Sequence, residues 1–212
     1  MNLHKPYNSD ITVLSATFNR HDFTFNMIHS LLEIFRVPVY ISILDNSTTT
    51  PFISADELDV DIISVIDNTK FAHTLNYGQP SKNHCSSIDY ALNHCINTKY
   101  TLLVDNDIIF HPAINNLLQE HHKFDVIGEI GYDIIPGNRL FPYMCLIDND
   151  FMTKNNINYF DEARCMTNNT MDTGASFYED CVANSANIKC IKLQHYITHL
   201  KGGTLHGKPL KF

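Results

Sequence analysis

The sequence has no tryptophan and is short of positive charge, and the second shortage limits which partners the protein can bind. Its 212 residues carry 15 Lys and Arg against 23 Asp and Glu, which gives a formal net charge of −8. A chain this acidic is a poor non-specific ligand for nucleic acid or an anionic membrane. We therefore expect no nucleic-acid partner, and any polyanionic ligand must be held locally, by a metal ion or a few basic residues.

Long apolar runs and cysteine motifs are also missing. No run approaches the roughly 20 residues of a transmembrane helix, and the first residues lack the apolar core of a signal peptide. The six cysteines include no pair with CxxC spacing, and a chain of this length does not need disulfides to build a core. These absences favour a cytoplasmic protein with reduced thiols and no transmembrane segment.

Strand and helix patterns alternate along the sequence. Hydrophobic residues make up 44% of the chain, which is enough for one sizeable core. Short β-branched runs predict strands, and apolar residues at helical spacing behind a cap or a proline predict helices. The predicted strands are 11–16, 39–44, 61–66 and 100–104, and the predicted helices are 22–35, 81–95 and 112–118. This alternation predicts a mainly parallel α/β sheet with helices on both faces.

The second half of the sequence is less regular. It predicts a polar loop over 149–169 and a helix over 172–184. Its predicted strands are 124–130, 140–147, 188–193 and 196–200. A break near residues 110–125 therefore separates a nucleotide-binding-like half from a more elaborated one, with no repeat and no clear linker.

Polar residues follow the predicted strands of the first half. Asp45-Asn46, Asp67-Asn68 and Asp105-Asn106 each end one strand. The carboxyl ends of parallel strands share one edge of the sheet, and ligands bind at that edge in open α/β folds. We therefore expect the functional site there.

The segment Asp105-Asn106-Asp107 is the strongest candidate within that edge. It lies between apolar residues, and side chains two apart on a strand point to the same side. Two carboxylates in such surroundings cost free energy unless a cation lies between them. A solvated turn is the alternative, and Asp148-Asn149-Asp150 is a second triplet of the same kind. We favour the first triplet because the second opens onto a polar stretch.

Several segments together resemble a known family. Residues 11–20, the Asp-ended second strand, the D-x-D after the fourth and the later 158–162 (Asn-Tyr-Phe-Asp-Glu) are similar to family-2-like glycosyltransferases with the GT-A fold. The resemblance implies a GT-A-like, Rossmann-like, mainly parallel sheet flanked by helices. It implies a single domain over 1–212, with a nucleotide-sugar-binding half at 1–110. The acceptor-side half and a C-terminal tail would occupy 111–212.

The resemblance also implies roles for residues of the first half. Asp107 would ligate Mn²⁺ or Mg²⁺ bridging the diphosphate of a nucleotide sugar, and Asp105 would assist through the ribose, a water or the metal. Asp45 would hold the base or ribose, unless it only caps a loop. The other implied contacts to the nucleotide sugar are Thr17, Asn19, Arg20, Lys82 and Asn106. The segment before Lys82 lacks the Gly-rich stretch that frequently precedes this position in the family.

Two further roles fall in the second half. Asp172 would be the general base that deprotonates the acceptor hydroxyl, or else a helix N-cap; Asp148, Asp150 and Glu179 are the alternatives for the base. A histidine beside the Gly202-Gly203 pair would complete the metal site, and His199 is favoured over His206.

These implications describe a metal-dependent glycosyltransferase. It would transfer a sugar from a nucleotide-diphosphate sugar, with a UDP-sugar favoured, to a hydroxyl of a glycan or other acceptor. Inversion is the favoured outcome, because a single displacement needs only one base. One alternative is a sugar-phosphate nucleotidyltransferase, which the absence of a Gly-rich basic loop after the first strand disfavours. The other is a non-catalytic module that binds nucleotide sugars.

Overall fold

Four parallel strands form the first half of the sheet. The computed structural model describes residues 9–48, 50–52, 63–68, 80–132, 138–159 and 174–200. The strands β1 (Ile11–Thr17), β2 (Tyr40–Asp45), β3 (Ile63–Asp67) and β4 (Tyr100–Asp105) lie in the order β3-β2-β1-β4, and each adjacent pair is parallel. β1 and β4 are buried along their whole length, as expected for strands with both faces covered.

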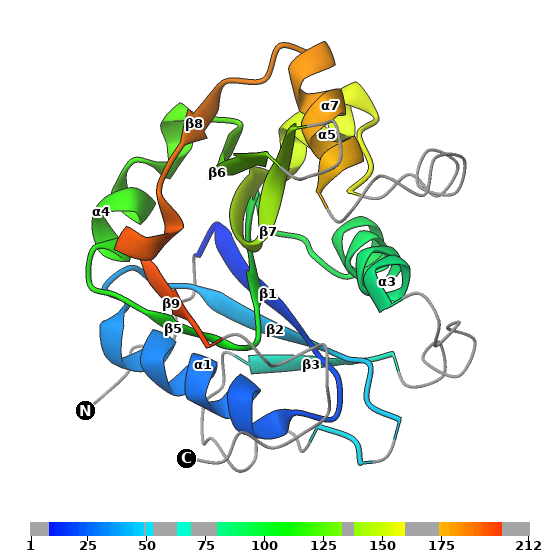
Figure 1. Ribbon diagram of the computed structural model, residues 1–212, viewed down its shortest axis with the longest axis vertical. Helices are drawn as coiled ribbons and strands as arrows, with labels where there is room; N and C mark the ends of the chain where they lie inside the picture. The colour runs from blue at the N-terminus through cyan, green and yellow to red at the C-terminus, as the bar shows by residue number, and fades with distance from the viewer. Residues whose placement is uncertain are drawn as a thin grey trace.

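The second half extends the same sheet. β7 (Asn138–Asp148) is antiparallel to β4, β6 (Val126–Tyr132) is antiparallel to β7, and β8 (Ile188–Cys190) is parallel to β6 (Figure 1). The described residues thus form one seven-stranded sheet in the order β3-β2-β1-β4-β7-β6-β8. Both halves of the sequence contribute to it, so the predicted α/β sheet is present.

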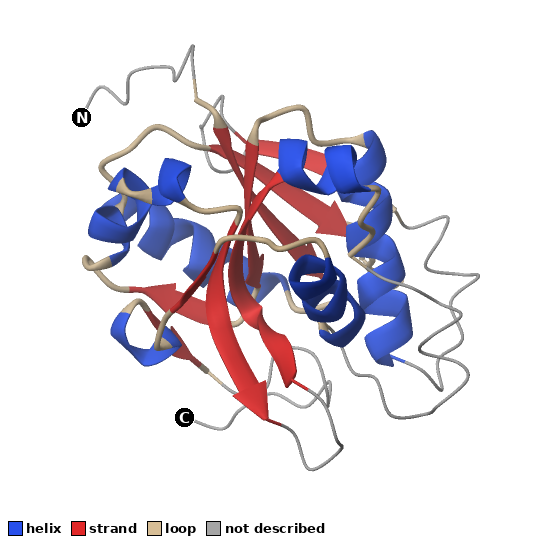
Figure 2. Ribbon diagram, turned by 90° about the horizontal axis from the view of Figure 1, so that it is seen from above, coloured by secondary structure: helices blue, strands red, loops and turns tan. Residues whose placement is uncertain are grey.

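Helices cover both faces of this sheet (Figure 2). Val13 of β1 belongs to one buried cluster with α1 (His21–Ile34) and α4 (Ile114–Gln119). Leu14, the next residue, belongs to a second cluster with α3 (Pro80–His94), α5 (Asn149–Asn155) and α7 (Ala175–Ala183). Successive strand residues point to opposite faces, so β1 separates the two cores.

A smaller sheet lies beside α1. β5 (Ile108–Phe110) starts shortly after β4 and pairs in antiparallel register with β9 (Ile197–His199). Short 3-10 turns over His121–Lys123 and Leu193–His195 follow α4 and precede β9. This sheet brings the last described residues back to the segment that follows β4 (Figure 1).

The structure differs from the sequence prediction at two helix starts. The sequence pattern offers Asp22 as the N-cap of the first helix, but α1 begins at His21, behind Arg20, and Asp22 lies in its first turn, where it pairs with Arg20. The predicted loop from residue 149 begins with α5, because the Asp148 carboxylate accepts hydrogen bonds from the backbone N–H groups of Asp150 and Phe151 and so caps a helix.

No helix in the described part of the chain is both long and apolar enough to cross a membrane.

Candidate functional site

Buried polar residues gather at the carboxyl edge of the parallel strands. Asp45 is in register with Thr17 on one side and Asp67 on the other, and Asp105 is in register with Ala16. The buried polar residues at or just beyond these strand ends are Thr17, Asp45, Asn46, Ser47, Asn68, Asp105, Asn106 and Asp107. Buried polar groups must be paired or hydrogen-bonded to be tolerated, so this edge is where the fold concentrates its polar chemistry.

Asp105, Asp107 and His199 come together at this edge. Each offers one ligand atom, and these atoms lie within 4.8 Å of one another. His199 Nε2 is 3.0 Å from Asp107 Oδ1 and 3.8 Å from Asp105 Oδ2. The histidine reaches the aspartates because it is in register with Ile108 across the small sheet, and because the Leu200 N–H donates to the Asp107 carbonyl at 2.8 Å.

The electrostatics of this cluster suit a divalent cation. Burial, and then the negative charge of Asp107, raise the pKa of Asp105 from 3.8 to about 7, and His199 offsets only part of this. A cation between the carboxylates would remove the repulsion that causes the shift. Two carboxylates and an imidazole are ligands that Mn²⁺ accepts, and the carboxylates suit Mg²⁺. The residues present therefore fit a bound metal.

Two further side chains flank the cluster. His84 of α3 places Nε2 3.8 Å from the other oxygen of Asp105, Oδ1. The ring of Tyr143, on β7, lies against the imidazole of His199, with centroids 4.2 Å apart and planes 32° apart. Sequence reasoning passed over both, because α3 and β7 reach the site only through the tertiary fold.

Arg20 lies at the same edge with one nitrogen still available. Its Nε and Nη2 donate to the carboxylate of Asp22 at 3.0 and 2.9 Å, and its guanidinium lies 4.0 Å over the ring of Phe23. Nη1 is buried and has no hydrogen-bond partner among the described residues. The hydrogen bond to Asp22 does most to raise the pKa of Arg20, and the charge of Asp107 adds to it. The Arg20 guanidinium is therefore close enough to Asp107 for the charge of that carboxylate to affect its pKa.

Thr17 and Asn106 support the site from inside the protein. The Thr24 hydroxyl of α1 donates to Thr17 Oγ1 at 2.9 Å, and Asn106 Nδ2 donates to Thr24 Oγ1 at 3.3 Å. Both side chains are buried, Thr17 at 0% and Asn106 at 1% exposure. They tie the end of β1, α1 and the segment between the two aspartates together, which fixes the backbone of the cluster.

Asn19 and Asp45 make hydrogen bonds within the loops that follow β1 and β2. Asn19, at φ 53°, donates from Nδ2 to Thr48 Oγ1, and its Oδ1 accepts from the backbone N–H of Thr48, both at 3.0 Å. The two oxygens of Asp45 accept from the backbone N–H groups of Ser47 and Phe52, at 3.0 and 2.7 Å. The Asp45 side chain thus caps the loop after β2, which is the alternative that the sequence left open beside nucleotide binding.

One aromatic residue at this edge did not figure in the sequence prediction. Phe18 directly follows β1, and its side chain is 37% exposed although most large apolar side chains of the described residues are covered. Its position between Thr17 and Asn19, both predicted contacts of a nucleotide, was the available signal.

Other predicted residues lie away from the cluster or outside the described residues. Asp148 is in register with Tyr100 at the start of β4, five positions before Asp105, so roughly 17 Å separates it from the cluster along the strand. Asp150 lies in the first turn of α5 beside it, and Glu179 is exposed on α7. The second Asp-Asn-Asp triplet is therefore a helix start at the opposite edge.

Lys82 lies in α3, but its side chain is not among those described. Asp172, His206 and most of the predicted family segment at 158–162 lie outside the described residues.

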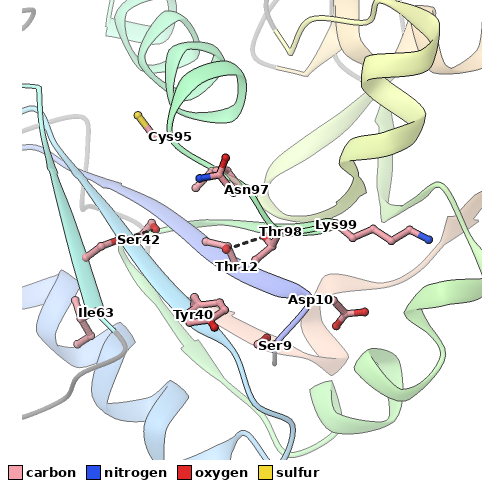
Figure 3. A pocket seen from close by; sticks show the side chains of 12 residues that line it. Ser9, Asp10, Thr12, Tyr40, Ser42, Ile63, Cys95, Asn97, Thr98 and Lys99 are labelled. Atoms are coloured by element: carbon pink, nitrogen blue, oxygen red, sulfur yellow. Dashed lines mark hydrogen bonds between the residues drawn. The ribbon is translucent and has the colours of Figure 1, made fainter. Parts of the chain in front are cut away.

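The amino edge of the parallel strands carries a cavity of about 650 Å³ (Figure 3). Its lining is rich in hydroxyls, which pair with one another: Thr98 Oγ1 donates to Thr12 Oγ1 at 2.8 Å, and Ser42 and Ser64 share a bond of 2.9 Å. These side chains lie at the strand starts, at the opposite edge from Asp105. The cavity lacks the carboxylate and imidazole set of the other edge, so we place the candidate site at the carboxyl edge.

Comparison with solved structures identifies the architecture. No protein-family model matches this sequence, and no curated protein matches it. TarS from S. aureus, solved with UDP-GlcNAc, has a TM-score of 0.55 at 16% identity over 88% of this chain and 57% of its own. The galactosyltransferase LgtC, with donor and acceptor sugar analogues, has a TM-score of 0.57 at 9% identity, over 86% of this chain and 74% of its own.

A mannosyltransferase from Pyrobaculum calidifontis, in complex with GDP-Man and Mn²⁺, has a TM-score of 0.57 at 11% identity, over 87% of this chain and 55% of its own. The chain therefore spans less than two thirds of TarS and of the mannosyltransferase. At these identities the similarity establishes the fold, which is the GT-A-like fold of glycosyltransferases.

Proposed function

We propose that this protein is a metal-dependent glycosyltransferase that moves a sugar from a nucleotide-diphosphate sugar to a hydroxyl of an acceptor. One observation carries the proposal: Asp105, Asp107 and His199 meet at the carboxyl edge of a sheet with the GT-A-like fold. This edge is where open α/β sheets bind ligands. A UDP-sugar is our favoured donor, and a glycan hydroxyl our favoured acceptor.

The metal ligands in this proposal are Asp107, Asp105 and His199, with Mn²⁺ or Mg²⁺ as the ion. When bound, the ion supplies Lewis-acid stabilisation of the nucleotide diphosphate as it leaves the sugar. The chain's own contribution is to hold two buried carboxylates and one imidazole within reach of a single ion. The hydrogen bonds of Thr24 to Thr17 and Asn106 keep the backbone between the two aspartates in place.

The residues beside the cluster would bind the donor. The unpartnered Nη1 of Arg20 is a donor for a phosphate oxygen, and the Asp22 carboxylate and the Phe23 ring hold the guanidinium in place. The exposed ring of Phe18 offers a stacking surface for the base. Asn19 and Asp45 shape the loops after β1 and β2 beside these residues, and Lys82, at the start of α3, would add positive charge.

Asp172 is our proposed general base, with inversion at the anomeric carbon. Support comes from its neighbour Gly174, which lies so close to the Leu140 carbonyl that a Cβ there would collide with it. β7 runs antiparallel to β4, with Met144 opposite Val104, so Leu140 lies beyond the carboxyl end of β4. Gly174, at the start of α7 and two residues after Asp172 in the sequence, therefore lies toward the sheet edge that carries the metal cluster, whereas Asp148 is at the other edge.

The proposal gives the two halves of the chain different roles. Residues 1–110 supply the strands and loops proposed to bind the nucleotide sugar. Residues 111–212 supply β7, β9 and the helix that follows Asp172, and would position the acceptor. We propose that the two halves act as one domain, because their strands share one sheet among the described residues.

The test is release of nucleoside diphosphate from a panel of UDP-sugars and GDP-sugars, with Mn²⁺ or with a chelator. We expect Mn²⁺-dependent release with at least one donor, and its loss in Asp107→Asn. Asp150→Asn is the matched control, because it alters the other Asp-Asn-Asp triplet at the opposite edge. Unchanged metal-dependent release in Asp107→Asn would contradict the proposal. Formation of pyrophosphate from a nucleoside triphosphate and a sugar phosphate would favour the nucleotidyltransferase alternative.

A thermal-shift series gives an independent reading of the same site. A ligand that binds only the folded chain raises its apparent stability by mass action. We expect nucleoside diphosphates to raise the melting temperature more in the presence of Mn²⁺ than with chelator, and Asp107→Asn to abolish that difference. The absence of a shift with every nucleotide would oppose donor binding altogether.

A further inference from the structure

The ring of Tyr143 is the closest aromatic neighbour of a proposed metal ligand among the described residues. Its centroid is 4.2 Å from that of the His199 imidazole, with 32° between the planes. Both side chains are partly buried, and they come from different sheets: Tyr143 from β7 and His199 from β9. The contact therefore joins the small sheet to the large one beside the cluster.

His199 needs such a support because its strand fixes the backbone but not the imidazole. β9 has three residues, and pairing with Ile108 and the bond from the Leu200 N–H to the Asp107 carbonyl place only the main chain. The imidazole can still rotate about two side-chain bonds. Its side chain is 24% exposed, and Nε2 lies 3.0 Å from Asp107 Oδ1; this contact holds the tip of the ring, whereas the plane of the ring depends on what packs against it.

Tyr143 is itself held on its far side. Its ring stacks on that of Phe141, with centroids 5.7 Å apart and planes 17° apart. The Phe141 ring lies against Gly131 of β6, where a Cβ would collide with it, and the Arg139 guanidinium lies 5.2 Å from the Phe141 centroid. A row of rings along β7 thus ends at the imidazole of His199, and packing against the larger buried cluster limits its movement.

We propose that Tyr143 is a positioning residue for the metal site: its ring holds the imidazole of His199 in the orientation that turns Nε2 toward Asp105 and Asp107. The proposal rests on the metal site of the proposed function and adds a residue that acts through a ligand and not on the metal. Partners that orient a ligating histidine strengthen metal binding. An aromatic pair supplies orientation as well as apolar contact.

The ring, and not the hydroxyl, should carry this effect. Tyr143→Phe keeps the stacking and should bind Mn²⁺ as the unaltered chain does. Tyr143→Leu removes it and should weaken Mn²⁺ binding by about 3- to 10-fold, which is the range for one aromatic pair. Phe141→Leu removes a ring that supports Tyr143 but has no ring contact with His199 among the described residues, so it should weaken Mn²⁺ binding less than Tyr143→Leu does.

Mn²⁺ affinity is measured from the electron paramagnetic resonance signal of free Mn²⁺, with circular dichroism to check folding. A larger loss of affinity in Tyr143→Leu than in Phe141→Leu, with Tyr143→Phe near the unaltered value, supports the proposal. Equal affinity in Tyr143→Leu overturns it, and so does equal loss in Tyr143→Phe or Phe141→Leu. Asp107→Asn distinguishes failure of the metal site from failure of the role of Tyr143. Normal Mn²⁺ binding by Asp107→Asn would overturn the metal site and the proposed function. Loss of Mn²⁺ binding in Asp107→Asn supports the metal site, and Tyr143→Leu then decides the role of Tyr143.

A second measurement uses the unaltered, metal-free chain and does not depend on a variant that folds. A proton over an aromatic ring resonates upfield of its usual position. We expect the imidazole ring protons of His199, assigned by through-bond correlation to the backbone of the unaltered chain, to be displaced upfield by Tyr143. Ring-proton shifts at the values of a solvated histidine would overturn the contact, and with it the proposal.

Discussion

Replacing Asp105 by asparagine should stabilise the metal-free chain at pH 8, even though the residue lies in the candidate site. Its carboxylate is buried beside Asp107, and these two causes raise its pKa from 3.8 to about 7. Above pH 7 the folded chain must therefore hold a charge that the unfolded chain carries more easily. Asparagine keeps the shape of the side chain and removes the charge.

The size and direction of the effect depend on pH. The folded state binds a proton at Asp105 more tightly than the unfolded state, so this group stabilises the fold fully below pH 3.8. The stabilisation is lost as pH rises from 3.8 through about 7. Within that window the loss is roughly 1.4 kcal/mol for each pH unit. The advantage of Asp105→Asn over the unaltered chain should therefore be largest at pH 8 and shrink steadily toward pH 5.

Urea unfolding of both chains at pH 5, 6, 7 and 8, with a chelator present, measures this difference. In saturating Mn²⁺ the order should reverse, because the ion stabilises only the chain that keeps its carboxylate. A free-energy difference that does not change with pH would refute the reasoning, as would an Asp105→Asn chain that is less stable than the unaltered one at pH 8 with chelator. Asp150→Asn controls for the general effect of removing one negative charge.

Other substitutions test separate parts of the structure. Arg20→Gln should weaken nucleoside-diphosphate binding about tenfold or more, measured by calorimetry with Mn²⁺, because a charge-assisted bond to phosphate is lost; unchanged affinity would remove Arg20 from the donor site. Asp148→Ala should cost about 1 kcal/mol of unfolding free energy through the lost cap of α5 and leave Mn²⁺ affinity unchanged. Gly174→Ala should lower the free energy of unfolding by more than about 1 kcal/mol, because the residue has φ 84° and a Cβ there would collide with the Leu140 carbonyl; equal stability would contradict that local geometry.

The sequence predicted the parallel half of the fold because its signals there are local. The apolar run before Asp105 identified a buried strand, and the alternation of such runs with helical patterns identified a parallel sheet. The edge position of Asp105 followed from the same logic, because the carboxyl ends of parallel strands share an edge. Asp107 reaches the same place by another route than the predicted strand alternation: β4 ends at Asp105 and β5 begins at Ile108, so Asp107 lies in a buried turn between them. Asp148-Asn149-Asp150 has the same local pattern, and only its register with the start of β4 shows that it lies at the opposite edge.

Contacts made by distant segments could be predicted less well. His199 reaches the aspartates through pairing of two three-residue strands, and such short strands carry little pattern of their own. Nothing in the sequence around Tyr143 or His84 indicates that α3 begins, and that β7 passes, beside the cluster. The loop contacts of Asp45 were equally hidden, because a carboxylate that accepts from backbone N–H groups looks the same in sequence as one that faces a ligand.

The register of Ile108 with His199 means that an ion held by this cluster would also be a cross-link. It would join the chain just after β4 to the last described strand, across a long intervening stretch that includes β6, β7 and α7. Like other cross-links, it would remove more freedom from the opened chain than from the closed one. Metal binding should therefore slow amide hydrogen exchange at β9 and β5 more than at β1. The exchange rate of β9 would then report what fraction of the protein carries the ion.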